Sequence, residues 1–170
     1  MLKLDKAILN DLKNIEKDYL RAKKLVEILF EDKKDKEGQP YIGHLIRVSN
    51  KLSNENTRIA GLLHDVVEDI PDFTFEDLRN LNFNEEIITL VKIVTKNKTK
   101  KEKYHDKITS IIKTNNIEAI KLKYSDMLDN FDTNRLNKLD IMTRSYLFNK
   151  YKDEIVRLEN ILKEKGEKLW

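Results

Sequence analysis

The sequence contains no cysteine, and it has only two prolines and four glycines among its 170 residues. Without cysteine there is no disulfide, no thiolate metal site and no cysteine nucleophile, so any metal must be held by histidine and carboxylate side chains. Such donors favour Mn, Fe, Mg or a catalytic Zn over a structural Zn site. The scarcity of proline and glycine, together with the lack of strand-like alternation, predicts an all-α protein.

Long apolar runs and a dominant charge sign are also missing. No stretch reaches membrane-spanning length, and the N-terminus carries no signal-peptide pattern. The 33 basic and 30 acidic residues nearly cancel, which argues against a tail that binds nucleic acid. These features predict a cytoplasmic protein without a membrane or nucleic-acid partner, and they leave the oligomeric state open. Because we find no repeat and no low-complexity linker, a single domain is expected over residues 1–170.

Apolar residues recur at helical spacing along most of the chain. The pattern predicts a long helix over residues 4–31 and then a charged loop at 32–40 that ends in Gly38 and Pro40. Further helices are expected from Pro40 to about 52, from Asn54 or Asn56 to Pro71, from Thr74 to about 81, after Asn84, over about 102–114, from Asn116, and over about 140–164. The one basic run, Lys96–Lys101, is expected to form a solvated loop, with a phosphate contact as the alternative.

The stretch Ala60–Asp69 combines one imidazole with three carboxylates. His64 and Asp65 are adjacent. Glu68 and Asp69 follow them at the i, i+4 spacing, so a helix would place all four polar side chains on one face. The opposite face is an apolar stripe: Ile59, Leu62, Leu63, Val66, Val67 and Ile70. An ordinary amphipathic helix with a solvated acidic face explains this segment equally well, so the rest of the chain must decide.

Two other segments supply matching groups. His44 lies one turn into its predicted helix, and Asp126 and Asn130 form an i, i+4 pair on a helix that is apolar on its other side. A lone histidine in such a place is more often structural than ligating. Together with the His64–Asp65 pair, however, these residues provide two nitrogens and two oxygens. That set suffices for one ion that keeps open positions for water and substrate.

The order His, His-Asp, Asp resembles that of the HD-domain phosphohydrolase superfamily. Three segments are similar to signatures of its RelA/SpoT-type hydrolases: Tyr41-Ile42-Gly43-His44, Leu62-Leu63-His64-Asp65-Val66-Val67-Glu68-Asp69 and Lys123-Tyr124-Ser125-Asp126-Met127-Leu128-Asp129-Asn130. Those enzymes remove the 3′-pyrophosphate from (p)ppGpp, typically with Mn²⁺. The Glu-Asp pair after His-Asp distinguishes their branch from other HD enzymes. The similar region runs from about residue 20 to about residue 135.

Carried over residue by residue, the resemblance implies four metal ligands: His44, His64, Asp65 and Asp126. It implies a pair that orients and deprotonates the attacking water: Glu68 and Asp69. Lys33 and Lys34 fall in the loop that meets the nucleotide in the family, and Asn130 falls near its ribose. For Arg135, a substrate phosphate contact and a surface ion pair are both open. The physics agrees, because a divalent ion lowers the pKa of bound water and a nearby carboxylate can take the proton.

The sequence also departs from the family. Leu45 stands where proline is usual, and Lys33 stands where arginine is usual, so a point charge replaces a flat guanidinium. The metal ligands are retained, but other substrates stay open. The alternatives are a phosphatase of a nucleoside monophosphate or of NADPH, and a nucleotide-sensing module without turnover. The tail resembles small stand-alone members without a synthetase domain, and His105 is expected to be a surface or packing residue.

Overall fold

The computed structural model describes residues 4–96 and 103–168. Its helices, in chain order, are α1 (Lys6–Lys13), α2 (Asp18–Leu29), α3 (Ile42–Asn50), α4 (Glu55–Leu63), α5 (Val66–Asp69), α6 (Phe75–Asn80), α7 (Glu85–Val94), α8 (Tyr104–Lys113), α9 (Ile117–Asn130), α10 (Thr133–Leu136) and α11 (Ile141–Glu164). Within this part of the chain there is no β-strand, and Lys34 and Pro40 form an isolated bridge in the loop between α2 and α3. The predicted all-α fold is confirmed.

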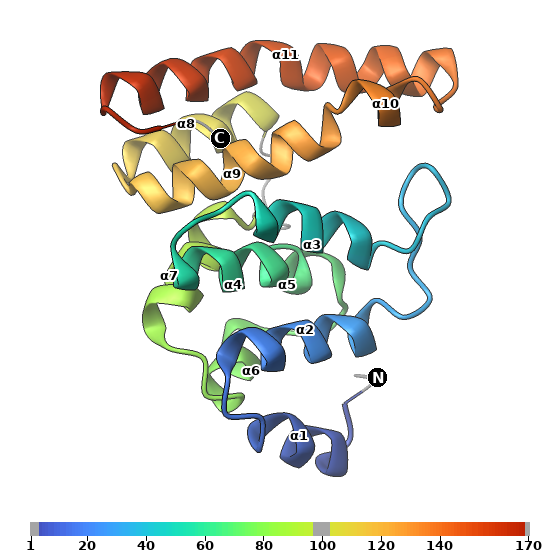
Figure 1. The fold of residues 1–170 in the computed structure, drawn as a ribbon, viewed down its shortest axis with the longest axis vertical. Coiled ribbons are helices and arrows are strands. Elements are labelled where there is room, and N and C mark those ends of the chain that lie inside the picture. Colours follow the sequence, from blue (N-terminus) through green and yellow to red (C-terminus); the bar gives the residue numbers. More distant parts are fainter. Residues whose placement is uncertain (1–3, 97–102, 169–170) are drawn as a thin grey trace.

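The helices stack in layers along the long axis of the molecule (Figure 1). Helix α11 lies across α8 and α9 at one end, while α1 and α6 lie at the other. Helix α4 runs through the middle and packs against α2, α3, α7 and α9. Gly61 of α4 allows the close approach of α3, because a Cβ at this position would lie 3.0 Å from the Cα of Ser49.

Local sequence signals account for most helix starts. The side chains of Asn54, Asn84 and Asn116 each accept a hydrogen bond from the backbone N–H three residues later. Thr74 opens α6 with a reciprocal capping box. The helical spacing of apolar residues over about 140–164 predicts one apolar face, and in α11 its residues are buried: Leu147, Tyr151, Ile155, Leu158 and Leu162. These starts and this buried face agree with the sequence-based expectations.

The single helix predicted over residues 4–31 is wrong, because the chain forms α1 and α2 there. Asn14 ends α1, and α2 begins at Asp18. The guanidinium of Arg21 donates from Nε and Nη2 to the Ile15 carbonyl, at 3.1 and 2.7 Å. In a continuous helix that carbonyl would instead accept a hydrogen bond from a backbone N–H. The break spans only residues 14–17, so periodicity alone does not reveal it.

The helix predicted up to Pro71 is also interrupted, at His64 and Asp65, between α4 and α5. Nδ1 of His64 lies 2.8 Å from the Gly61 carbonyl. In a continuous helix that carbonyl would accept from the backbone N–H of Asp65. Consequently Glu68 and Asp69 sit on a separate turn after the His-Asp pair, not on one unbroken helical face.

Two further points concern the connections between helices. The one-turn helix α10 was not expected from the sequence, and the Asp132 side chain caps it. The basic run at residues 96–101 lies outside the described residues except for Lys96, so neither prediction for it is tested.

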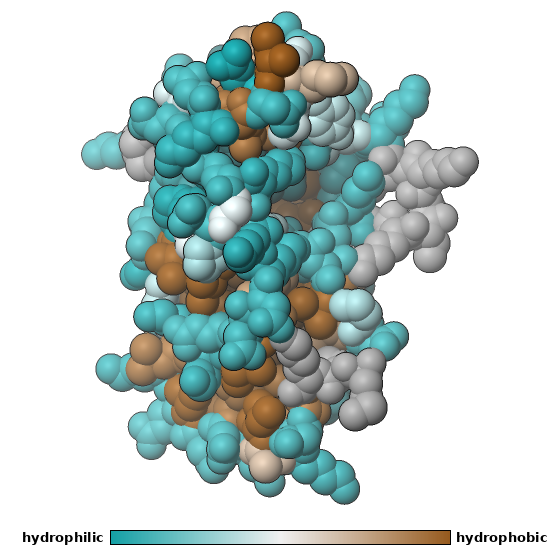
Figure 2. Space-filling view, turned by 90° about the vertical axis from the view of Figure 1, so that its right-hand side faces the viewer, coloured by the Kyte–Doolittle hydropathy of each residue, from teal (hydrophilic) through white to brown (hydrophobic). Residues whose placement is uncertain are grey.

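None of the described helices combines the length and the apolar character required to cross a membrane. Hydrophilic side chains cover most of the face shown in Figure 2, the side on which the loop between α2 and α3 projects.

Candidate metal centre

A cleft of about 890 Å³ lies between the loop of residues 32–40 and the helices α3, α5, α9 and α11. Every site residue predicted from the sequence lines it except His64: Lys33, Lys34, His44, Asp65, Glu68, Asp69, Asp126, Asn130 and Arg135. The ring of His64 lies next to that of His44, with centroids 5.4 Å apart in an edge-to-face arrangement. The fold therefore gathers groups that are more than 90 residues apart in the sequence, from Lys33 to Arg135.

The two histidines and two aspartates converge at the base of this cleft. Nε2 of His44 lies 3.4 Å from Oδ1 of Asp126 and 3.8 Å from Oδ2 of Asp65. Nε2 of His64 lies 3.1 Å from the same Asp65 oxygen and 3.7 Å from the same Asp126 oxygen. His44, His64 and Asp126 are buried, and their ligand atoms lie within 4.8 Å of one another. The arrangement brings two nitrogens and two oxygens around one point.

The tautomers of the two histidines show that this arrangement fits a cation. A carbonyl only accepts hydrogen bonds, so the contact with Gly61 places the His64 proton on Nδ1 and leaves a lone pair on Nε2. Among the described residues that buried Nε2 has no hydrogen-bond partner. Nδ1 of His44 lies 2.7 Å from the Asp129 carboxylate, so its Nε2 lone pair faces the site as well. Two lone pairs and two carboxylates directed at one point repel each other unless a positive charge lies between them.

The pKa values of the ligand groups reflect the same electrostatics. Burial opposes the protonated form of His44, but hydrogen bonds with Asp126 and Asp129 outweigh burial and raise its pKa. The pKa of His64 is raised further, because the charges of Asp65 and Asp126 outweigh its complete burial. Burial alone would raise the pKa of Asp126, yet Lys123 and the two histidines hold it well below its usual range. In the absence of a metal, protons are therefore drawn to the imidazoles.

Neighbouring side chains hold both aspartates in place. The Tyr41 hydroxyl donates to Oδ2 of Asp65 at 2.5 Å. Burial and that carboxylate raise the pKa of Tyr41 far above its usual range, so it stays a donor. Lys123 Nζ donates to Oδ2 of Asp126 at 2.7 Å, and Asn130 Nδ2 donates to Oδ1 at 2.7 Å. The sequence pattern does not mark Tyr41 and Lys123 as site residues, although each lies three residues before a predicted ligand, the spacing that brings helical side chains together.

Glu68 and Asp69 both reach the cleft, and each has a partner. Oε2 of Glu68 accepts the backbone N–H of Lys96 at 2.9 Å. Oδ2 of Asp69 accepts from Lys33 Nζ at 2.5 Å. The same ammonium lies 3.9 Å from the centroid of the Tyr41 ring, which adds a cation–π contact. The loop of residues 32–40 is thereby joined to the turn that carries the acidic pair.

Arg135 lies on the cleft wall, but its guanidinium is occupied by carboxylates. It donates to Glu37, to Asp129 and, at 3.0 Å, to Asp35. Its side chain is only 17% exposed. Of the two roles left open by the sequence, the ion pair is the one that the structure contains, and it lies inside the protein.

One part of the cleft is basic. Lys36, Lys123 and Lys150 all line it, together with Tyr104 and Tyr151. Burial, helped by the charges of Lys123 and Lys36, lowers the pKa of Lys150 to about 8. Its ammonium lies 4.7 Å and 4.9 Å from the centroids of the Tyr104 and Tyr151 rings. A cleft lined by several lysines is suited to an anionic ligand.

His105 does not belong to the cleft. Its Nδ1 lies 2.5 Å from Oε1 of Glu154, and Arg157 donates to the other oxygen at 3.3 Å. The pair joins α8 to α11, as expected for a surface or packing residue.

Comparisons with known proteins point to one family. The profile of the family described as HD domain matches residues 22–127. The chain is 37% identical over 113 residues to a guanosine-3′,5′-bis(diphosphate) 3′-pyrophosphohydrolase, MESH1, of Drosophila melanogaster, covering 62% of each chain. It is 39% identical over 110 residues to a guanosine-3′,5′-bis(diphosphate) 3′-pyrophosphohydrolase of Aquifex aeolicus, covering 60% of this chain and 16% of that protein. The match thus spans less than two thirds of the length of these relatives.

A solved structure agrees with the sequence comparisons. It is that of a metazoan orthologue of SpoT described as hydrolysing ppGpp, and it superposes with a TM-score of 0.70 at 26% identity. The superposition covers 88% of this chain and 96% of the other. The layered helical arrangement of Figure 1 is therefore shared over nearly the whole of that protein.

Proposed function

The chain belongs to the HD-domain family, and we propose that it is a metal-dependent phosphohydrolase that removes the 3′-pyrophosphate of guanosine-3′,5′-bis(diphosphate). The observation that carries the proposal is the convergence of two imidazole lone pairs and two carboxylates at the base of a cleft that is also lined by lysines. A divalent ion would satisfy the imidazoles and carboxylates, and a phosphorylated ligand would satisfy the lysines. The relatives named above support the choice of substrate.

In this proposal His44, His64, Asp65 and Asp126 hold the ion, and Mn²⁺ fits the mixture of nitrogen and oxygen donors. When bound, the ion supplies a water of lowered pKa and positive charge beside the phosphoryl oxygens. The residues around the ligands fix their orientation. Tyr41 and Lys123 each donate to an aspartate, so the carboxylates cannot rotate away from the site.

Glu68 and Asp69 act on the attacking water. Glu68 is the general base, because its second oxygen is not the one bound by the Lys96 backbone and can accept a proton. Asp69 orients the water and is itself held by Lys33. The water oxygen forms a bond to the phosphorus next to the ribose, the bond from that phosphorus to the 3′ oxygen breaks, and the 3′ oxygen takes up a proton. The products are guanosine diphosphate and pyrophosphate.

The basic side chains of the cleft bind the phosphates. Lys33 and Lys34 both line the cleft, and we assign both of them to the nucleotide. Lys36 and Lys150 extend the same positive surface toward α11. Asn130 donates to Asp126 and keeps its carbonyl oxygen for the ribose. Arg135 contributes by fastening the loop of residues 32–40 to α9 through Asp35 and Glu37.

A substrate panel tests the proposal. Purified protein with Mn²⁺ is incubated with guanosine-3′,5′-bis(diphosphate), NADPH and nucleoside monophosphates, and the products are separated and identified. The proposal predicts equal amounts of guanosine diphosphate and pyrophosphate from the first substrate, with loss of both when Asp126 is replaced by alanine. Preferential turnover of NADPH or a monophosphate would reassign the substrate, and binding of the nucleotides without turnover would indicate a sensing module.

A further inference from the structure

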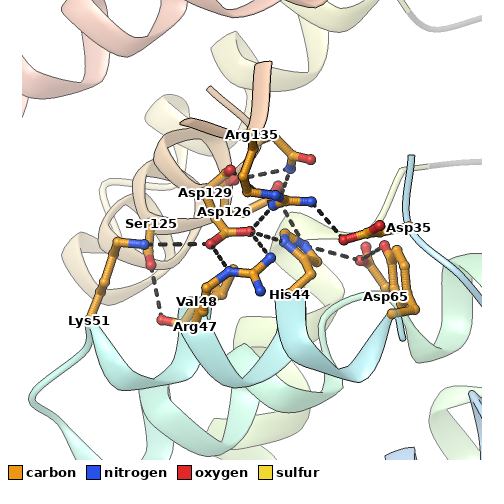
Figure 3. A network of polar contacts seen from close by, with 12 residues as sticks. Asp35, His44, Arg47, Val48, Lys51, Asp65, Ser125, Asp126, Asp129 and Arg135 are labelled. Carbon is orange, nitrogen blue, oxygen red and sulfur yellow. Dashed lines mark hydrogen bonds and ion pairs between the residues drawn. The ribbon is translucent and has the colours of Figure 1, made fainter. Parts of the chain in front are cut away.

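Asp129 is the most heavily bonded carboxylate near the site, although it does not line the cleft. It lies one turn after Asp126 on α9, and its side chain is only 2% exposed. Oδ2 lies 2.7 Å from His44 Nδ1, and Oδ1 accepts from Arg47 Nε at 2.7 Å. Arg135 also donates to Oδ2. Figure 3 shows these side chains reaching Asp129 from α3 on one side and from α10 on the other.

We propose that Asp129 is a positioning residue that fixes the ring of His44 for metal binding. The proposal rests on the proposed function, since it assigns a role within the same metal centre. An ionised carboxylate only accepts hydrogen bonds, so His44 must carry its proton on Nδ1 when it is neutral. The lone pair of Nε2 is then directed at Asp126 and Asp65. Such a bond also makes the imidazole a stronger donor to a metal, because the carboxylate stabilises the positive charge that ligation places on the ring.

Two arginines and one lysine surround Asp129 and hold its carboxylate in place. Arg47 binds both oxygens, with Nη2 at 3.1 Å from Oδ2. Lys51 Nζ lies 3.7 Å from Oδ1. With both oxygens engaged, the carboxylate cannot turn away from His44 without breaking bonds to an arginine.

The same network reaches the substrate side of the cleft. The guanidinium of Arg135 that contacts Asp129 also donates to Asp35 and Glu37. These acids belong to the loop that carries Lys33 and Lys34 into the cleft. Asp129 thus connects the orientation of a metal ligand to the anchor of the loop proposed to bind the nucleotide.

The substitution Asp129→Asn tests this role. It preserves size, but one side of the amide becomes a donor, and His44, Arg47 and Arg135 all present donors to it. We expect the dissociation constant for Mn²⁺, measured by titration calorimetry, to rise about 10–100-fold, and turnover to recover at high Mn²⁺. Glu154→Gln is the matched control, because Glu154 is also a buried carboxylate between a histidine and an arginine but lies outside the cleft. Its Mn²⁺ affinity should equal that of the parent.

The outcomes separate this inference from the proposed function. If the parent protein binds no Mn²⁺, the metal centre itself fails. If the parent binds Mn²⁺ and Asp129→Asn binds it equally well, the positioning role is overturned. A second measurement needs no variant: ¹⁵N NMR of the metal-free parent, at a pH where His44 is neutral, should show the proton on Nδ1. A neutral His44 with its proton on Nε2 would overturn the inference even if Asp129→Asn fails to fold.

Discussion

The ammonium of Lys33 lies 2.5 Å from Oδ2 of Asp69 and makes a cation–π contact with the Tyr41 ring. It therefore links the loop of residues 32–40 to the acidic turn after α4. In the proposed reaction Asp69 orients the water, so Lys33 acts on the chemical step as well as on the nucleotide. Lys34, its neighbour in the same cleft wall, is proposed to contact the nucleotide alone.

This difference gives a prediction for the two lysines. Lys33→Met should lower kcat, because Asp69 loses the partner that fixes one of its oxygens. Lys34→Met should mainly raise KM, because a binding contact is lost while the water-orienting group keeps its place. Steady-state kinetics on both variants measures the split. An unchanged kcat in Lys33→Met would show that the contact with Asp69 does not matter for turnover.

The roles of the acidic groups can be separated by a second pair of substitutions. Asp126→Ala should remove the metal and with it turnover. Glu68→Gln keeps the size and the hydrogen-bonding capacity of the side chain but cannot accept a proton, so it should retain the metal and lose roughly 10²–10⁴-fold in kcat. Metal content and single-turnover rates on the same samples provide the comparison. A Glu68→Gln enzyme that also loses the ion would place Glu68 among the ligands.

The raised pKa values of His44 and His64 predict that protons compete with the metal. Ligation needs neutral imidazoles, so metal affinity should fall as the pH decreases through these raised values. Activity should decline on the acid side, and the midpoint of the decline should move to lower pH as the Mn²⁺ concentration increases. An acid limb that is insensitive to Mn²⁺ would mean that another group controls it.

The stability of the metal-free protein should decrease as the pH rises through the neutral range, whereas the metal affinity should increase. A histidine whose pKa is raised by folding stabilises the fold below the unfolded value of about 6.5, and this contribution is lost as the pH rises through the folded pKa. Asp126 contributes above the unfolded value of about 4 and stops contributing as the pH falls toward its lowered pKa. Melting curves with a chelator should therefore show a decrease in Tm above neutral pH, which added Mn²⁺ reverses.

Gly61 and Gly43 provide a matched test of the packing that positions the histidines. A Cβ at Gly61 would lie 3.0 Å from the Ser49 Cα, and backbone cannot give way, so Gly61→Ala should destabilise the protein by about 1–3 kcal/mol. A Cβ at Gly43 would meet only the Arg47 Nη1 atom, at 3.2 Å, which is the end of a flexible side chain. Gly43→Ala should therefore stabilise α3 by about 0.5–1 kcal/mol or be neutral. Chemical denaturation measures both, and equal effects would contradict the proposed close contact between α3 and α4.

The sequence predicts well those features that depend on local signals. The caps at Asn54, Asn84 and Asn116 and the buried stripe of α11 follow from residue type and spacing, and the structure contains them. The all-α fold follows in the same way, and the HD-domain family follows from the resemblance of three segments to its signatures. The break after Asn14 and the interruption at His64 do not, because each depends on a side chain that takes a backbone carbonyl.

Prediction of the site shows the same limit. His44, His64, Asp65 and Asp126 are predicted as a set from their pattern, and the fold brings the four side chains together. The role of Asp129 is hidden, since its partners Arg47 and Arg135 come from other helices and meet it only in the folded protein. Arg135 itself illustrates the difficulty, because a basic residue close to a site in sequence can be bound by acids of another loop.

In the proposed metal centre, two histidines and two aspartates hold one divalent ion. Pulsed electron paramagnetic resonance of the protein loaded with Mn²⁺ tests it most directly, because nitrogen nuclei bound to the metal split or modulate its signal. We expect one Mn²⁺ per chain with coupling to two imidazole nitrogens. When His44 is replaced by alanine, coupling to only one nitrogen should remain. A bound Mn²⁺ without nitrogen coupling, or a spectrum unchanged by His44→Ala, would contradict it.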